Sequence, residues 1–189
     1  MRIIAGEARG RIIDAPKGEN TRPTLDRVRE NLFNMLQPDV PGSRVLDLFA
    51  GSGALSLEAI SRGAVQAVLV DHDWEAVRVQ RNNISRLGYE DRTLQMLCDW
   101  QKALCRLSQE QMLFDLVFLD PPYRMRDLRD LSELLIPVIH SGTLVVLEHE
   151  ASTETAFSER FAKRRERAWG YCAVSFYQLQ SEGEGGDTE

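Results

Sequence analysis

The chain has 189 residues, of which 43% are hydrophobic and 28% are charged, and its formal net charge is −6. This length and apolar content fit one globular domain with a substantial core, and no apolar run approaches the length of a membrane span. The first residues become charged and glycine-bearing too soon for a signal peptide, so a cytoplasmic protein is expected. The three cysteines and three histidines are scattered and lack the spacing of a disulfide framework or a metal site.

Charge is unevenly distributed along the chain. Four of the six net negative charges come from the last nine residues, 181–189, which contain no base. An acidic, glycine-rich tail of this kind is expected to be disordered. The first thirty residues carry seven Lys and Arg side chains against five acids, so a local basic face could meet nucleic-acid phosphates. A second basic cluster, within residues 160–167, is better explained as a solvated surface.

The N-terminal segment has its own pattern. Residues 1–20 contain two short apolar stretches around a glycine-containing turn, which predicts a β-hairpin outside the main sheet. Thr24 or Asp26 could then cap an amphipathic helix within residues 21–38, which Pro38 ends. The apolar side of this helix is expected to pack against the sheet.

Between residues 44 and 180, short apolar strands alternate with amphipathic helical stretches. This alternation predicts an α/β fold with a mostly parallel sheet and helices on both of its faces. The predicted strands are 44–49, 66–71, 93–98, 114–119 and 143–148, the predicted helices are 53–62, 74–87, 100–108 and 127–138, and two more strands are expected around 164–169 and 172–179.

A turn with two glycines follows the first of these strands. The sequence Ala50-Gly51-Ser52-Gly53 leads into a helix, and its glycines let the backbone pass close to a ligand at the helix N-terminus. A dinucleotide-binding loop would have Gly or Ala where Ser56 stands, and Asp47 at the strand end would repel a pyrophosphate. The turn is therefore better suited to a cofactor with cationic sulfonium and ammonium groups. A structural turn without a ligand is the alternative.

The next two strands also end in acids. Asp71 lies about twenty residues past the glycine turn, where an acid can accept hydrogen bonds from both hydroxyls of a ribose, whereas Asp73 is expected to cap the next helix. Asp99 could accept from an adenine amino group while Trp100 packs on the ring, although a helix N-cap with a partly buried Trp explains this pair equally well. The candidate cofactor-binding residues are Thr24, Asp47, Phe49, Ala50, Gly51, Gly53, Asp71, His72, Asp99 and Trp100.

The motif Asp120-Pro121-Pro122-Tyr123 follows the predicted strand 114–119. An exocyclic amine on a nucleobase is a poor nucleophile because its lone pair is delocalised into the ring, so a catalyst must accept its N–H hydrogens. The Asp120 carboxylate and the Pro121 carbonyl could accept them, since the two prolines restrict the backbone around them. Tyr123 could stack on a base that has left its helix. A turn that closes the strand is the alternative explanation.

Ligands of parallel α/β sheets bind beyond the carboxyl ends of the strands. Asp47, Asp71, Asp99 and Asp120 all stand at predicted strand ends, and they are therefore expected to border one site. A chemical group carried by a cofactor in that site would pass directly, in line, to the amine held at Asp120. No cysteine is needed as a covalent nucleophile.

Six blocks of the sequence together resemble the bacterial 16S ribosomal RNA guanine-N2 methyltransferase D family. The blocks are 2–6, 9–11, 22–24, 27–34, 46–53 and 120–123. The glycine turn alone is typical of S-adenosylmethionine-dependent methyltransferases, and Asp-Pro-Pro-Tyr is typical of an amino-group target, whereas the N-terminal blocks are specific to the family. The sequence departs from the family's pattern at Ser56, where glycine is expected.

The resemblance implies a Rossmann-like methyltransferase fold, with an antiparallel last strand in a seven-stranded sheet. It implies transfer of a methyl group from S-adenosylmethionine to N2 of one guanine, guanine 966 of 16S ribosomal RNA. The implied partner is that RNA or the assembling small ribosomal subunit; no metal is expected, and nothing indicates more than a monomer. The candidate catalytic residues are Asp120, Pro121, Pro122 and Tyr123, and the candidate RNA-binding residues are Arg9, Arg11, Arg22 and Arg29.

Three other functions remain as alternatives. A DNA adenine-N6 methyltransferase shares the acidic Pro-Pro-Tyr motif but usually needs a separate target-recognition region, for which this chain has no room. Protein glutamine methyltransferases resemble the pattern Asn-Pro-Pro-Tyr, whereas this chain has Asp120. A non-catalytic RNA-binding assembly factor would not bind S-adenosylmethionine, and the acids at the strand ends argue against it.

Overall fold

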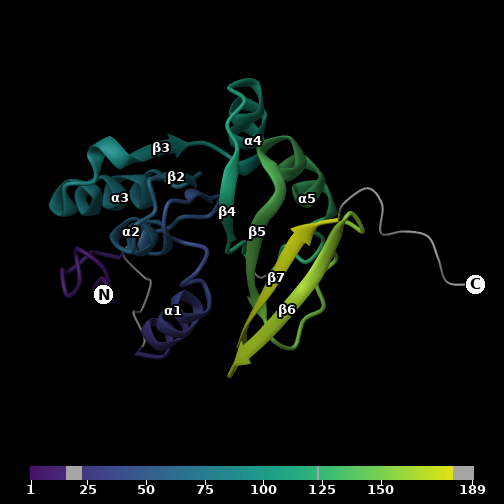
Figure 1. The fold of residues 1–189 in the computed structure, drawn as a ribbon, viewed down its shortest axis with the longest axis horizontal. Helices are drawn as coiled ribbons and strands as arrows, with labels where there is room; N and C mark the ends of the chain where they lie inside the picture. The colour runs from purple at the N-terminus through teal and green to yellow at the C-terminus, as the bar shows by residue number, and fades with distance from the viewer. Residues whose placement is uncertain (16–22, 123, 181–189) are drawn as a thin grey trace, which may run out of the picture.

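The computed structural model describes residues 1–15, 23–122 and 124–180. Within them, seven strands form one sheet in the order β3-β2-β1-β4-β5-β7-β6 (Figure 1). The strands are β1 (Arg44–Asp47), β2 (Gln66–Asp71), β3 (Thr93–Leu97), β4 (Phe114–Leu119), β5 (Ile139–Glu150), β6 (Phe161–Trp169) and β7 (Cys172–Leu179). Neighbouring strands from β3 to β5 are parallel, whereas β7 runs antiparallel to β5 and β6. The predicted mostly parallel sheet with an antiparallel last strand is confirmed.

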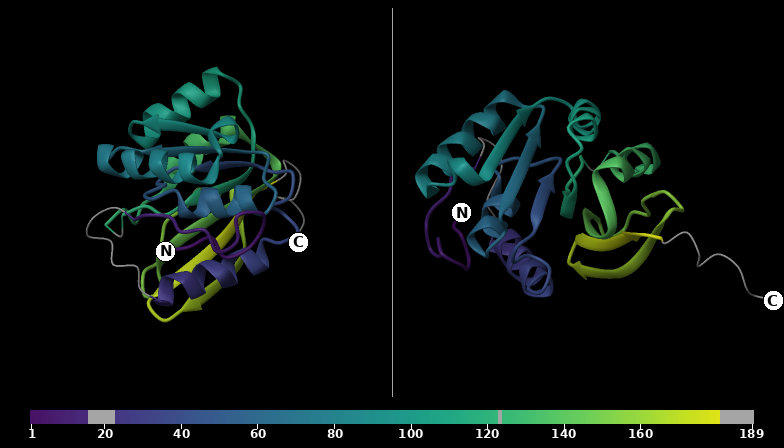
Figure 2. Two further views of the ribbon diagram at one scale, coloured as in Figure 1. Left: turned by 90° about the vertical axis from the view of Figure 1, so that its left-hand side faces the viewer. Right: turned by 45° about the horizontal axis from the view of Figure 1, so that its top comes forward.

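Helices cover both faces of this sheet (Figure 2). The described α-helices are α1 (Pro23–Met35), α2 (Ala54–Ser61), α3 (Trp74–Leu87), α4 (Trp100–Gln109) and α5 (Arg129–Leu135). Apolar side chains of α1, α2 and α3 pack on one face, and those of α4 and α5 pack on the other. Central strands buried on both faces need apolar residues at successive positions, as Val45-Leu46 and Ala67-Val68-Leu69-Val70 provide.

Several element boundaries differ from the sequence prediction, most of them by one to three residues, and two elements show why. The predicted helix 127–138 ends as α5 at Leu135 and continues as a single 3-10 turn, Ile136–Val138. Pro137 explains the change, because proline has no N–H for the α-helical hydrogen bond. The predicted strand 143–148 extends to Ile139–Glu150, since its first residue already pairs with Phe114 before a register shift. The predicted cap of α3 is confirmed, because the Asp73 side chain accepts from Glu75 N–H at 2.9 Å.

Residues 1–15 form a short antiparallel loop that lies against α2, with one bridge in place of the two full strands of the expected hairpin. Its two sides are joined by one antiparallel bridge, Arg2 to Ile12, and by hydrogen bonds from Ile3 N–H to the Arg11 carbonyl and from Ile13 N–H to the Met1 carbonyl, at 3.0 and 3.1 Å. Beyond Ile3, the next backbone N–H groups donate to α2 instead of continuing this pairing. Ile4 and Ala5 donate to the buried Glu58 carboxylate at 2.8 and 3.0 Å. Gly6 has φ +84, and a Cβ there would lie 1.8 Å from the Ser61 carbonyl oxygen, so the contact requires glycine.

In the described part of the chain, none of the helices combines the length and the apolar character that crossing a membrane would need.

Candidate functional site

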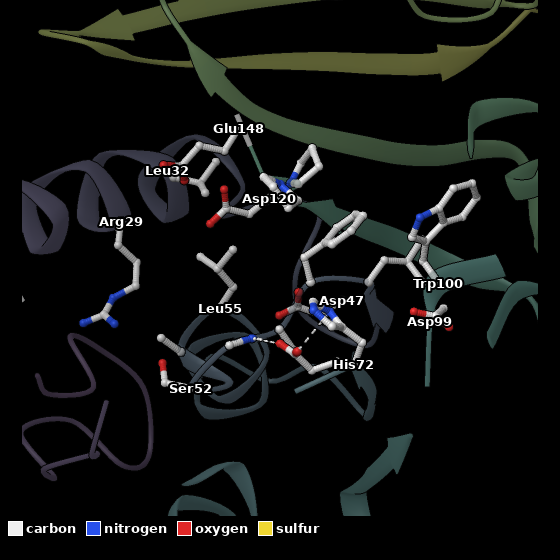
Figure 3. A pocket seen from close by; sticks show the side chains of 18 of the residues that line it. Arg29, Leu32, Asp47, Ser52, Leu55, His72, Asp99, Trp100, Asp120 and Glu148 are labelled. Carbon is white, nitrogen blue, oxygen red and sulfur yellow. Dashed lines mark hydrogen bonds and ion pairs between the residues drawn. The ribbon is translucent and has the colours of Figure 1, made fainter. Parts of the chain in front are cut away.

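A cavity of about 590 Å³ lies at the carboxyl ends of the central strands, and α1 forms its opposite side (Figure 3). Eight of the ten predicted cofactor residues line it, namely Asp47, Phe49, Ala50, Gly51, Asp71, His72, Asp99 and Trp100. Asp120, Pro121 and Pro122 line the same cavity. The turn after β1 and the motif after β4 are therefore on one site, because adjacent parallel strands end at the same edge of the sheet.

The glycine turn is shaped by backbone conformations that favour glycine. Gly51 and Gly53 have φ of +50 and +80, in the left-handed region. Gly53 is the N-cap of α2, and a Cβ there would come within 2.8 Å of Leu69 Cδ2. Gly53 is not among the cavity-lining residues. Its part is to turn the chain so that Gly51 and Ser52 line the cavity.

Asp47 reaches the cavity wall but is almost entirely covered, with 1% of its surface exposed. Burial raises the pKa of its carboxyl to about 7, and the nearby Asp71 carboxylate raises that pKa too. Hydrogen bonds from the Ser56 hydroxyl, at 2.9 Å, and from the backbone of Phe49 and Ser56 oppose the rise. Ser56, the departure from the family's pattern, therefore holds the acid at the end of β1.

Asp71 connects the end of β2 to the glycine turn. One of its carboxylate oxygens accepts from Gly51 N–H and the other accepts from Asp73 N–H, both at 2.9 Å. These bonds fix the carboxylate at the cavity wall, where 12% of the side chain remains exposed. The His72 side chain is 70% exposed, with Nδ1 3.7 Å from an Asp71 oxygen. His72 therefore lies on the solvent side of this wall.

Asp99 and Trp100 form the wall beyond β3. Asp99 is the N-cap residue of α4, but its side chain makes no capping hydrogen bond. Asp99 is thus both the N-cap residue and a cavity residue. Its carboxylate is 59% exposed, lies 3.9 Å from Lys102 Nζ, and can still accept hydrogen bonds from a ligand. Trp100 is half-buried and packs, with Phe49 and Cys98, against the core on the α4 side. This wall offers aromatic and apolar surface beside an acid.

The segment after β4 places an exposed carboxylate against this pocket. Asp120 is exposed, whereas Pro121 beside it is buried. In Figure 3 the Asp120 side chain points into the space between Leu55 and Glu148. Tyr123, the last residue of the predicted motif, lies outside the described residues, as do Arg22 and the side chain of Thr24.

The sequence prediction missed several residues of the cavity. Glu148, near the end of β5, lines it beside Asp120, and Arg29 and Leu32 line it from α1. Glu148 was detectable, because it is an acid near the end of a fifth parallel strand. Arg29 was not, because a helical pattern does not say which residues near its apolar side will border a pocket.

Three of the candidate RNA-binding arginines, Arg9, Arg11 and Arg29, belong to the described residues, and their surroundings differ. Arg9 is exposed. Arg11 donates to the carbonyl oxygens of Leu87, at 3.2 Å, and Arg86, at the end of α3. Arg29 is 6% exposed, lies in the cavity wall, and donates to the Arg2 carbonyl at 2.6 Å.

Across the described residues, no three His, Cys, Asp or Glu side chains come together in a group that could hold a metal ion. Cys98 is half-buried, Cys105 is exposed and Cys172 is buried, and all three are free thiols. Burial raises the pKa of the Cys172 thiol, and the neighbouring Glu148 raises it further.

Comparison with known proteins gives a consistent result over the whole described fold. A family model described as "Conserved hypothetical protein 95" matches residues 1–178. The Ribosomal RNA small subunit methyltransferase D of Escherichia coli (strain K12) is 34% identical over 187 residues, which cover 97% of this chain and 92% of that protein. The solved structure of yhhF from Escherichia coli has a TM-score of 0.81 at 33% identity, and covers 96% of this chain and 99% of that one.

A solved hypothetical protein of Thermus thermophilus has a TM-score of 0.80 at 32% identity, over 95% of this chain and 99% of that one. The match therefore extends through the N-terminal segment, the glycine turn and the motif after β4. The chain belongs to the family of the ribosomal RNA small subunit methyltransferase D and has its Rossmann-like methyltransferase fold.

Proposed function

We propose that this protein is an S-adenosylmethionine-dependent methyltransferase that acts on the exocyclic N2 amino group of a guanine in 16S ribosomal RNA, guanine 966. One observation carries the proposal: the glycine turn after β1 and Asp120-Pro121-Pro122 line a single cavity. A methyl donor held at the turn would face an amine held at Asp120. The named activity of the Escherichia coli relative supports an RNA substrate.

The residues of the cavity fit this cofactor by their chemistry. Asp71 offers a carboxylate for the ribose hydroxyls, and Asp99 offers one for the adenine amino group. Phe49 and Trp100 supply apolar surface for the adenine ring. Asp47 lies too deep for extensive contact, so its part is to fix the turn and to add negative charge when it is ionised. When bound, S-adenosylmethionine supplies a methyl group activated by a positively charged sulfur.

Asp120 prepares the amine for transfer. Its carboxylate accepts one N2–H of the extruded guanine, and the Pro121 carbonyl accepts the other, which directs the nitrogen lone pair toward the methyl group. The cofactor, held by the glycine turn, Asp71 and Asp99, would supply the methyl group to N2, and Asp120 would pass the displaced N2 proton to solvent. Positioning supplies most of the rate in such a reaction. Tyr123 contributes a face on which the base stacks.

The RNA would reach the cavity past α1 and the N-terminal segment. Arg29 lies in the cavity wall, and Arg9 is exposed on the segment that packs against α2. Phosphate contacts from an exposed side chain such as that of Arg9 would fix the register of a nucleic acid without reading its sequence. Arg22 remains a candidate by sequence alone. The partner in this proposal is 16S ribosomal RNA or the assembling small subunit.

Mapping of methylated nucleotides tests the function directly. RNA from cells that lack this protein should be missing one N2-methylguanine of 16S ribosomal RNA, and the purified protein with S-adenosylmethionine should restore it on small subunits from those cells. An unchanged map would overturn the proposal. Methylation of adenine N6 in duplex DNA would support the DNA enzyme instead. Absence of S-adenosylmethionine binding by calorimetry would support a non-catalytic assembly factor.

A further inference from the structure

Glu148 is a second carboxylate beside the one that the proposed reaction uses. The register of β4 and β5 pairs Leu119 with Leu147, so the next positions, Asp120 and Glu148, are neighbours. Figure 3 shows the two carboxylates side by side at the same end of the cavity. The side chain of Val146, two residues earlier on β5, packs on the α1–α2 face of the sheet. Strand alternation therefore directs Glu148 to that face, toward α1 and the cavity.

Only the Cys172 thiol and the neighbouring His149 favour the ionised form of the Glu148 carboxyl among the described residues. The side chain is half-buried, and no Lys or Arg ion pair to it exists among the described residues. Within the described residues, the one hydrogen bond to its carboxylate comes from the Cys172 thiol, a weak donor, at 3.2 Å. Burial raises the pKa of its carboxyl. A partly desolvated acid with so little compensation is costly to the fold, and a ligand with N–H donors would lower that cost.

Guanine presents such donors on one edge. Its N1–H and N2–H groups are adjacent and point the same way, so two neighbouring carboxylates can accept from them together. Adenine has an unprotonated N1, and cytosine has an unprotonated N3, at the corresponding position. A carboxylate placed there would meet a lone pair and repel either base.

We propose that Glu148 selects guanine as the target base by accepting a hydrogen bond from N1–H while Asp120 holds the N2 amino group. This inference rests on the proposed function, because it concerns the base that the same cavity receives. It adds a specificity-determining contact that the acid–Pro-Pro-Tyr motif does not contain. The motif binds the amino group, and the hydrogen bond to Glu148 selects the base to which that amino group belongs.

Base analogues separate the N1 contact from the N2 chemistry. Small subunits are reconstituted with 16S ribosomal RNA in which the mapped target guanosine is replaced, by ligation, with 2,6-diaminopurine or 2-aminopurine riboside. Both analogues keep the 2-amino group but lack N1–H. A hydrogen bond to a charged group supports a loss of about 10- to 100-fold in kcat/KM for each analogue with the unaltered protein.

The variant Glu148→Gln should change the preference for guanosine over the analogues and not only the rate of methyl transfer. Its amide can donate N–H to the unprotonated N1 of an analogue, so turnover of guanosine should fall while the guanosine-to-diaminopurine ratio shrinks toward one. Glu150→Gln is the matched control, because Glu150 lies on the same strand but outside this cavity. It should keep the original ratio. Calorimetry with S-adenosylmethionine tests whether both variants are folded and bind the cofactor, as is expected.

Equal methylation of guanosine and both analogues by the unaltered protein would overturn the role of Glu148, and so would an unchanged ratio in a Glu148→Gln variant that binds the cofactor. Neither result would contradict the proposed function, because methyl transfer to N2 would have been observed in both. Failure of the unaltered protein to methylate the natural guanosine would instead overturn the proposed function itself.

Discussion

Asp120 is the residue whose position matters most for the proposed chemistry. It follows β4, yet its carboxylate borders the cavity of the turn that follows β1. Asp120→Ala should retain S-adenosylmethionine binding, because the predicted cofactor contacts come from other strands. Methyl transfer should fall by about 100-fold or more, as expected when a group that positions or deprotonates the nucleophile is removed.

Calorimetry and a methyl-transfer assay on small subunits measure these two effects separately. Asp130→Ala is the matched control, since Asp130 is an exposed acid on α5 away from the cavity. Normal turnover in Asp120→Ala would remove this carboxylate from the mechanism.

Ser56 should control the ionisation of Asp47. The folded-state pKa of Asp47 is raised to about 7, so this acid holds its proton in the folded protein at pH values where the unfolded chain has lost it. Its contribution to the free energy of unfolding therefore falls as pH rises from the ordinary Asp range to about 7. Ser56→Ala removes a donor that favours the ionised form, so it raises the pKa further and extends the fall to higher pH.

The expected loss of stability in Ser56→Ala is about 0.5–1.5 kcal/mol at pH 5.5 and about 1.5–3 kcal/mol at pH 8.5. Urea denaturation at the two pH values measures it. Ser43→Ala is the control, because the buried Ser43 hydroxyl donates to the uncharged Val40 carbonyl at 2.7 Å. Its cost should not change with pH. Equal costs for Ser56→Ala at both pH values would contradict the role given to this hydroxyl.

Strands and helices could be predicted from the sequence wherever the local residue pattern matches the burial that the fold requires. The strands β2 and β4 and the helix α3 have the predicted bounds, since their apolar runs are terminated by Asp71, Asp120 and the glycine after Leu87. The pairing of the expected N-terminal hairpin does not extend beyond Ile3, for a reason outside its own sequence. Its hydrogen-bond partner is Glu58, a buried acid of α2 whose role no local pattern indicates.

Glu58→Gln should release the N-terminal segment. The amide retains only one acceptor oxygen for Ile4 N–H and Ala5 N–H, and it loses the ion pair with Arg62. The free energy of unfolding should fall by about 3 kcal/mol. Hydrogen exchange of the Ile4 and Ala5 amides should accelerate, and cofactor affinity should weaken, because Met1 lines the cavity.

Denaturation and residue-resolved exchange check this expectation. Glu75→Gln is the control, since Glu75 is an exposed helical acid that pairs with Arg78 across one turn. It should cost less than about 1 kcal/mol. Unchanged exchange at Ile4 and Ala5 in Glu58→Gln would show that other contacts hold the segment.

At the scale of the whole molecule, the parallel strand topology determines which residues of the site could be predicted from the sequence. Acids that follow parallel strands meet at one edge, so Asp71, Asp99 and Asp120 could be assigned to one cavity from sequence alone. The side of the cavity formed by α1 could not, because it depends on how that helix packs across the sheet. Arg29 was consequently expected on an RNA-binding surface and lies in the cavity wall.

The molecule is acidic overall, yet two basic side chains of β6, Arg165 and Arg167, lie on the face of the sheet that borders the cavity. Arg167 of β6 pairs with Val174 of β7, and Val174 pairs with Glu148 of β5. Arg167 therefore lies two strands, about 10 Å, from Glu148 and on the same face of the sheet. Arg165 follows on that face, stacked 4.6 Å from the Phe176 ring centroid. Both arginines are exposed, so phosphates flanking the target base could contact them.

The double variant Arg165→Gln, Arg167→Gln should therefore weaken RNA binding and reduce its salt dependence. Each lost phosphate contact lowers the slope of log K against log salt by about 0.7–0.9, so the slope should fall by roughly 1.5, with S-adenosylmethionine binding unchanged. Arg106→Gln with Arg129→Gln removes the same charge from α4 and α5, on the opposite face. Equal slopes for the two double variants would mean that the β6 arginines are only solvated, because net charge alone would then explain the effect.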